Sequence, residues 1–125
     1  MSKTVALRTL IVEILKEVGC VVYYENATKG AQFPYIVYSF DSFNYEYDSR
    51  DDVFLLVDVW DKNKTSSKVE ELTDTVEKVL GYTNRPNSDT LATFFKESRM
   101  SVEDEDELIH HRQVRVKIEN YYVGA

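Results

Sequence analysis

The chain has 125 residues, of which 43% are hydrophobic and 30% charged, as in one ordinary globular domain over 1–125. Its 22 acidic and 15 basic residues give a net charge of −7 and form no basic patch, which disfavours binding to nucleic acid or anionic lipid. The apolar runs are too short for a membrane span and no signal peptide is recognisable, so we expect a cytosolic protein without membrane contact. Cys20 is the single cysteine, which excludes an internal disulfide.

The first predicted element is a helix over about 3–18, because apolar residues recur there at three- and four-residue spacing and Gly19 follows. A short strand is expected over 20–24. The polar loop over 25–33 then ends at Pro34.

A long hairpin is predicted next. Its first strand changes phase, as a bulge or a twist would produce, from Ile36, Tyr38 and Phe40 to Phe43, Tyr45 and Tyr47. The turn 48–52 leads into a second strand over 53–60. This strand is apolar on both sides, with Val53, Leu55, Val57 and Val59 on one face and Phe54, Leu56 and Trp60, interrupted only by Asp58, on the other.

The second helix is predicted to start near Ser67, which has capping-box spacing to Glu70, and to stop before Gly81. A loop is expected over 82–89. The next strand is predicted to place Ala92, Phe94, Met100 and Val102 on one face and Leu91 and Phe95 on the other. The last strand alternates cleanly, with Val114, Val116, Ile118 and Tyr122 between Gln113, Arg115, Lys117 and Glu119.

The order of elements is therefore α-β-β-β-α-β-β. We predict an α+β fold with a mostly antiparallel sheet of about five strands and two helices packed on one face. A single layer of helices leaves one face of a sheet with two apolar sides uncovered. We expect that leftover face to meet another subunit.

No residue pattern predicts catalysis, a cofactor or a metal, so the sequence indicates a protein that is not an enzyme. His110 and His111 are consecutive strand residues that point to opposite faces, and we interpret them as exposed rather than as ligands of one metal. The acidic run 103–107 lacks the glycine of a calcium loop and is predicted to be a solvated turn. Cys20 has no recognisable catalytic partner, and no phosphate-binding loop or nucleophile elbow occurs.

The nine tyrosines favour protein contacts over nucleic acid. Tyr45 and Tyr47 alternate with Glu46 and Asp48 rather than with basic residues, so they are not suited to stack on bases. Tyrosine and tryptophan are enriched at protein interfaces, although ordinary core packing remains an equal alternative for several of them.

Together these elements resemble the tail terminator proteins of long-tailed bacteriophages and prophages, also called tail completion or tail-to-head joining proteins. The resemblance covers nearly the whole chain. It begins with a helix-first start, a loop ending in Phe33-Pro34-Tyr35 and a hairpin with a charged turn. It continues through the segment Val57-Asp58-Val59-Trp60-Asp61-Lys62 before the second helix and the final strand from Arg115 to Tyr122.

This resemblance implies a homo-oligomeric ring, typically a hexamer, that sits on the last ring of major tail tube protein, stops tube growth and joins the head connector. A monomer before it meets a tail remains an alternative. DNA would pass through the channel without specific binding, and an acidic lining suits that passage. The implied locations are the bacterial host cytoplasm during assembly and then the tail or neck of the virion. The resemblance carries over no catalytic residues.

Two hypotheses on contacts follow. The subunit interface is expected to use hairpin residues with apolar or aromatic side chains, namely Tyr45, Tyr47, Phe54, Leu56 and Trp60. Contacts with the tail or the connector are expected in the 26–32 loop or the 48–52 turn, at Asn26, Thr28, Lys29, Gln32, Asp48, Arg50 and Asp52.

Three other interpretations stay open. A head-closure or connector protein of the phage neck could use a similar small ring subunit. A small cytosolic domain that binds a peptide at its sheet edge would be a stable monomer. A small hydrolase would use Cys20 or the histidines.

Overall fold

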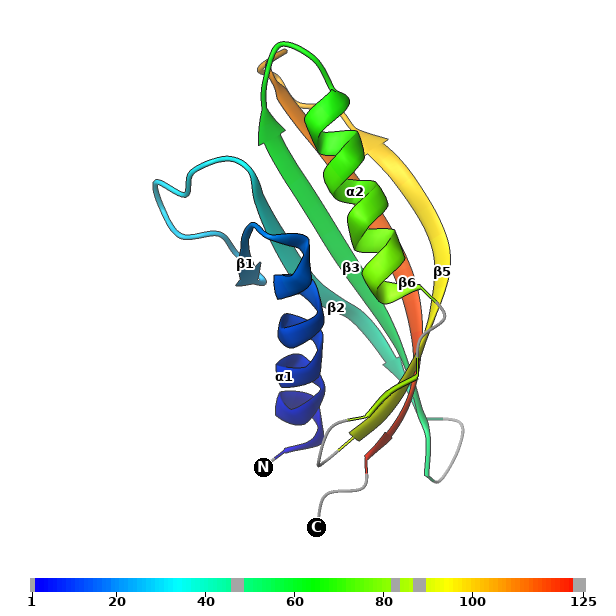
Figure 1. Cartoon of the computed structure of the whole chain (residues 1–125). Helices are drawn as coiled ribbons and strands as arrows, with labels where there is room; N and C mark the ends of the chain where they lie inside the picture. The colour runs from blue at the N-terminus through cyan, green and yellow to red at the C-terminus, as the bar shows by residue number, and fades with distance from the viewer. Residues whose placement is uncertain (1, 46–48, 82–83, 87–89, 123–125) are drawn as a thin grey trace.

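The computed structural model describes residues 2–45, 49–81, 84–86 and 90–122. Its centre is a six-stranded sheet in the order β1-β2-β3-β6-β5-β4 (Figure 1). The strands are β1 (Val21–Tyr24), β2 (Tyr35–Asn44), β3 (Asp51–Lys62), β4 (Asn84–Pro86), β5 (Thr90–Val102) and β6 (Ile109–Tyr122). Within this sheet β1 and β2 are parallel, and the other neighbouring pairs are antiparallel.

Two α-helices lie on the same side of the sheet (Figure 1). The first, α1 (Lys3–Leu15), continues into the short 3-10 turn η1 (Lys16–Val18) and ends at Gly19, whose φ of 93° is left-handed, as the sequence predicts. The Ser2 hydroxyl caps its start by accepting a hydrogen bond from the Val5 amide at 3.0 Å. Neither helix in the described chain has the length and apolarity needed to cross a membrane.

The second helix, α2 (Ser67–Leu80), has the predicted extent but not the predicted cap. The N-cap is Ser66, and its side chain makes no capping hydrogen bond. The expected capping box of Ser67 and Glu70 is wrong, because the Glu70 carboxylate pairs instead with Arg99 and Arg112 of the sheet. Two arginines outcompete a backbone amide for this carboxylate.

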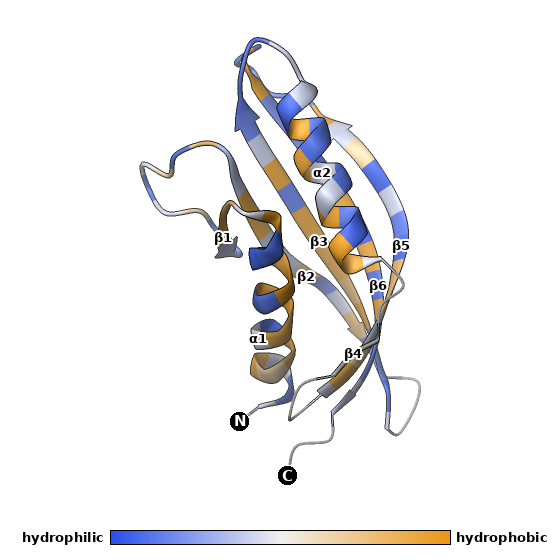
Figure 2. Cartoon of the chain, viewed as in Figure 1, coloured by the Kyte–Doolittle hydropathy of each residue, from blue (hydrophilic) through white to orange (hydrophobic). Residues whose placement is uncertain are grey.

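The core lies between the helices and one face of the sheet. Figure 2 shows apolar residues alternating with polar ones along β3 and β6, and apolar stripes on the helices. The residues that carry this core are fully buried, among them Leu7, Ile11, Ile14, Ile36, Val53, Leu55, Val57, Val59, Val76, Phe94, Val116 and Ile118.

The α+β fold class, the element order and the helices on one face are confirmed. One element is added: the predicted loop over 82–89 contains the short strand β4, which pairs with β5 at the edge of the sheet. Its three residues are too few to produce a readable alternation of apolar and polar side chains.

Two β-bulges shift the strands that flank the central pair β3–β6. In β2 the register skips Asp41 between Phe40 and Ser42, which returns Phe43 to the helix side and confirms the predicted change of phase. In β5 the register skips Glu97 between Lys96 and Ser98.

The bulge in β5 contradicts one prediction. Phe94 lies opposite Ile118 of β6, whereas Met100 lies opposite Gln113. Because residues 113 and 118 of one strand point to opposite faces, Met100 does not share the face of Phe94, and neither does Val102. The prediction assumes a regular strand, and the bulge at Glu97 reverses the alternation beyond it.

Candidate functional site

The sheet face opposite the helices, here called the open face, carries the apolar residues left over from the core. Phe54, Leu56 and Trp60 of β3 lie on it and are half-buried, whereas their neighbours in sequence point under the helices. On β5 the side chains of Leu91 and Met100, 39% and 54% exposed, belong to the same face by their pairing with β6. The expected uncovered face is therefore present in the described chain.

Charged side chains cross the middle of the open face. Arg115 of β6 donates hydrogen bonds to Asp41 and Glu97, each at 2.9 Å. These two carboxylates belong to the residues that the two bulges insert. The same guanidinium lies over the Phe54 ring, 4.7 Å from its centroid, so apolar and charged groups share this part of the face.

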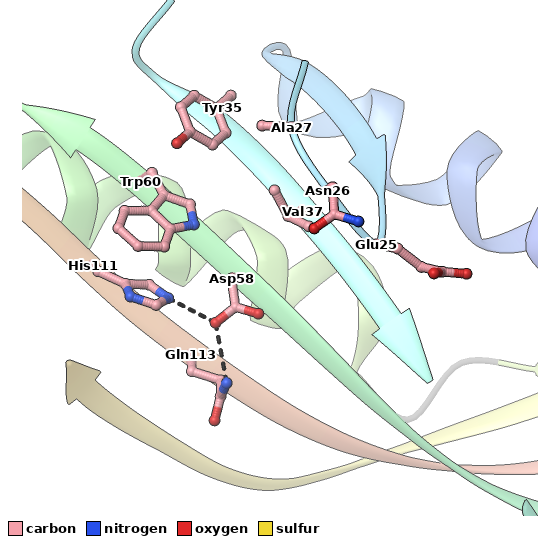
Figure 3. Close-up of a pocket in the computed structure, with 9 residues that line it drawn as sticks. All are labelled: Glu25, Asn26, Ala27, Tyr35, Val37, Asp58, Trp60, His111 and Gln113. Carbon is pink, nitrogen blue, oxygen red and sulfur yellow. Dashed lines mark hydrogen bonds and ion pairs between the residues drawn. The ribbon is translucent and has the colours of Figure 1, made fainter. Parts of the chain in front are cut away.

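A pocket of about 380 Å³ opens beside these residues, between the loop that follows β1 and the strands β2, β3 and β6 (Figure 3). Its lining residues come from these four segments: Glu25, Asn26, Ala27, Tyr35, Val37, Asp58, Trp60, His111 and Gln113.

One side of the pocket is a row of rings. Tyr35, Trp60 and His111 are direct neighbours across β2, β3 and β6. The ring centroids of Trp60 and His111 are 3.7 Å apart and those of Tyr35 and Trp60 are 6.2 Å apart, both pairs stacked. Cross-strand ring pairs of this kind stabilise a sheet and hold the side chains in place.

Asp58 anchors the base of the pocket. Its Oδ1 atom accepts a hydrogen bond from Nε2 of His111 at 2.6 Å and another from Nε2 of Gln113 at 3.1 Å (Figure 3). The Asp58 and His111 side chains are only 16% and 10% exposed. A half-buried carboxylate needs such donors, since an unpaired one would be costly.

The prediction that both histidines are exposed is wrong for His111, which is covered by Trp60 and bonded to Asp58. His110 points to the other side, as predicted, where its Nε2 atom hydrogen-bonds with the carbonyl oxygen of Asn63 at 3.1 Å. Among the described residues no group of three His, Cys, Asp or Glu side chains is placed to hold a metal ion.

Tyr35 in the pocket and Cys20 are among the groups with a shifted pKa. Burial raises the pKa of the Tyr35 hydroxyl, and the nearby Tyr23 and Asp104 add to the effect, so Tyr35 is a neutral hydrogen-bonding group in the pocket. Burial also raises the pKa of the Cys20 thiol, although Lys68 opposes the shift. A protonated, half-buried thiol is a poor nucleophile.

The five residues expected at a subunit interface do not form one surface. Phe54, Leu56 and Trp60 share the open face. Tyr45 is 64% exposed and lies on the helix side, where its ring stacks on Phe43 and Lys3 sits 4.7 Å from its centroid. Tyr47 lies outside the described residues.

Of the loop residues expected to contact a tail or connector, Asn26 lines the pocket and Thr28, Lys29 and Gln32 are exposed. Arg50 and Asp52 instead pair with each other at 2.9 Å, and Asp52 is only 8% exposed. Asp48 lies outside the described residues.

Asp58, His111 and Gln113 were not predicted to form a cluster. One signal was available, because Asp58 interrupts an otherwise apolar face and a half-buried carboxylate implies a donor nearby. The donors could not be named, since they lie on β6, which is 53 and 55 residues further along the chain.

Comparison with known proteins agrees with this fold. The family described as Tail completion protein gp17 matches residues 3–119. Among solved structures, a chain of "Virion of native gene transfer agent (GTA) particle" is similar with a TM-score of 0.70 and 11% sequence identity, over 96% of this chain and 99% of that chain. No curated protein matches. Because the family match extends from the start of α1 almost to the end of β6, this chain belongs to the family of Tail completion protein gp17.

Proposed function

We propose that the protein forms a ring that caps the phage tail tube, ends its elongation and provides the surface that joins the head connector. Its family gives it a structural role in a phage tail, and a chain with the same fold occurs in a gene transfer agent virion. In this proposal the protein acts in particle assembly and not in catalysis. It is made in the host cytoplasm and ends in the tail or neck of the virion.

The observation that carries this proposal is the open face. The helices bury one side of the sheet, and the other side keeps Phe54, Leu56 and Trp60 half-buried. Fully burying one such side chain contributes roughly 1.5–3 kcal/mol, so a few per contact suffice when the contact repeats around a closed ring. The ring size follows from the contact angle, and a hexamer is the size that we propose.

The remaining surfaces suit the other partners. In this proposal the loop after β1 contacts the tail tube protein or the head connector, and the exposure of Thr28, Lys29 and Gln32 supports that role. A net charge of −7 on every copy repels DNA phosphates, which favours passage of DNA without binding.

The experiment is electron microscopy of particles produced without this protein. We expect overlong tails or tails that are not joined to heads. Tails of normal length joined to filled heads would contradict the proposal. Normal tails beside heads that have leaked their DNA would instead support the head-closure alternative.

The role of the open face is tested with the double variant Phe54→Ser/Leu56→Ser supplied to the same particles. We expect it to fold, because both side chains lie outside the core, and to leave tails uncapped. The matched control is Leu108→Ser, which removes an exposed leucine from the acidic turn, where 44% of the residue is accessible. Capping by the double variant at the level of this control would remove these residues from the interface.

A further inference from the structure

The pocket on the open face has an unbalanced charge. Glu25 and Asp58 both line it, and no lysine or arginine occurs among the described residues around it. His111 is the one basic group there, and its Nε2 atom is already engaged with Asp58. The pocket therefore offers negative charge to whatever enters it.

The geometry leaves part of that charge available. Both hydrogen bonds to Asp58 fall on Oδ1, and in the described chain no bond is made to Oδ2 (Figure 3). Glu25 is exposed at the rim of the pocket, where it hydrogen-bonds with the Tyr24 hydroxyl and its carboxylate points away from Asp58 (Figure 3). Beside these carboxylates, Tyr35, Val37 and Trp60 offer apolar surface. A lysine side chain matches this combination, because its methylene stem packs on apolar groups while its ammonium stays with a carboxylate.

The chain itself can supply such lysines. Each described arginine side chain already contacts a carboxylate or, for Arg8, the ring of Tyr24. In contrast, five exposed lysines make no ion pair within the described chain, namely Lys16, Lys29, Lys64, Lys68 and Lys78. Lys68 and Lys78 belong to α2, and Lys16 follows α1, so these three are on elements of the helix side of the sheet.

We propose that the pocket receives a lysine side chain from the helix side of a second copy of this chain. The contact is head-to-tail, between two different surfaces, which is the kind of contact that closes into a ring. Copies that each carry a charge of −7 repel one another, so a local pairing of opposite charges is needed to fix how they meet. The inference rests on the proposed ring and adds the groups that set its register.

The first experiment measures the chemistry of the pocket. Trp60 is the only tryptophan, so its fluorescence reports directly on the pocket. We expect a saturable change with N-acetyl-lysinamide and none with N-acetyl-norleucinamide, which has the same stem without the charge. Asp58→Asn should bind the lysine probe about tenfold more weakly, and Glu25→Gln, which changes a carboxylate at the rim, should have a smaller effect in the same direction. Glu107→Gln is the control, since it changes the net charge equally at an exposed residue that does not line the pocket.

A response that is equal for the two probes, or unchanged in both pocket variants, would overturn the proposal. Both substitutions keep the shape of the side chain, and thermal unfolding would confirm that each variant is folded.

The second experiment identifies the source of the lysine, by counting the copies of each variant on isolated tails. Asp58→Asn, and at least one of Lys16→Glu, Lys68→Glu and Lys78→Glu, should reduce the number of copies retained, while Glu107→Gln should not. Full retention in all the lysine variants would overturn the second copy as the occupant. The two proposals can be told apart. Binding of the lysine probe and association of the copies through the pocket would support this contact even if particles lacking the protein still had normal tails. Normal tails on those particles would contradict the capping function alone.

Discussion

Arg115 shows how one residue organises the open face. Its guanidinium joins Asp41 of β2 to Glu97 of β5 across the two central strands, and it covers the Phe54 ring on the way. The Arg115, Asp41 and Glu97 side chains are 34%, 43% and 36% exposed, so water screens both ion pairs. Such pairs orient groups more than they stabilise the fold.

We predict that Arg115→Met lowers the free energy of unfolding by no more than about 1 kcal/mol, the usual range for exposed ion pairs. Urea denaturation at low and high salt measures the effect, which should shrink as salt screens the pairs. Asp41→Asn in the Arg115→Met background should then have little further effect. A loss of several kcal/mol that does not depend on salt would mean that Arg115 acts through packing.

At the scale of elements, the bulge in β2 behaves as a single inserted residue. Phe40 lies opposite Leu55 and Ser42 lies opposite Phe54, with Asp41 between them unpaired. Without Asp41 the strand would alternate regularly and every remaining residue would keep its face.

We therefore predict that deletion of Asp41 gives a folded protein that loses only the bend and one partner of Arg115. Deletion of Ser39 is the matched control, because it shortens the strand by the same one residue. Regular alternation would then place Phe40 on the open face and Asp41 beneath the helices, where an unpaired carboxylate is costly. Circular dichroism and urea denaturation of the two variants provide the measurement. Equal stability of the two deletions would show that the bulge does not determine the register.

Arg99 of β5 links α2 to the sheet by ion pairs, in addition to the buried apolar side chains of the helix. Its guanidinium contacts Glu70, Asp74 and Glu77, one on each successive turn of the helix, at 3.3, 2.6 and 3.2 Å. Arg99 is 25% exposed and Glu77 is 23% exposed, so this pair is less screened than the pairs of Arg115.

We predict that Arg99→Met destabilises the protein by about 1–2 kcal/mol, more than Arg115→Met, because it also leaves Asp74 and Glu77 close together without a cation, while Glu70 keeps Arg112. Hydrogen exchange should show the loss of protection mainly in α2. Lys78→Met removes an exposed cation from the same helix without an ion pair in the described chain and should have almost no effect. Unchanged exchange in α2 would contradict the assigned role.

Patterns within a single element predict most helices and strands. The wrong predictions concern residues whose environment depends on contacts between elements far apart in the sequence. The left-handed Gly19, the alternation in β6 and the phase change after Phe40 are all readable within about ten residues of sequence. The bulge at Glu97 has no such signal, so Met100 was placed on the wrong face. The covering of His111 and the engagement of Glu70 both depend on strand pairings that only the folded chain brings together.

For the whole molecule, burial of acidic protons makes stability sensitive to alkaline pH. Burial raises the pKa of the Cys20 thiol and of the hydroxyls of Tyr24, Tyr35 and Tyr38. The folded protein therefore holds these protons to a higher pH than the unfolded chain does. Once the pH exceeds the unfolded thiol value of about 8.5, the folded state binds more protons, and the free energy of unfolding must fall as the pH rises.

We predict a decrease in the free energy of unfolding from about pH 8.5 to pH 11, steepest above about pH 10, where the unfolded tyrosines lose their protons and the folded ones still hold them. Urea denaturation across this range provides the measurement. The first part of the decrease belongs to the thiol, so Cys20→Ala should delay its onset toward the tyrosine range, while Tyr35→Phe should reduce only the later part. The slopes rather than the absolute values are compared, because both substitutions also alter packing. A stability that stays constant up to pH 11 would show that these groups titrate alike in the folded and unfolded chain, and so that burial does not hold their protons.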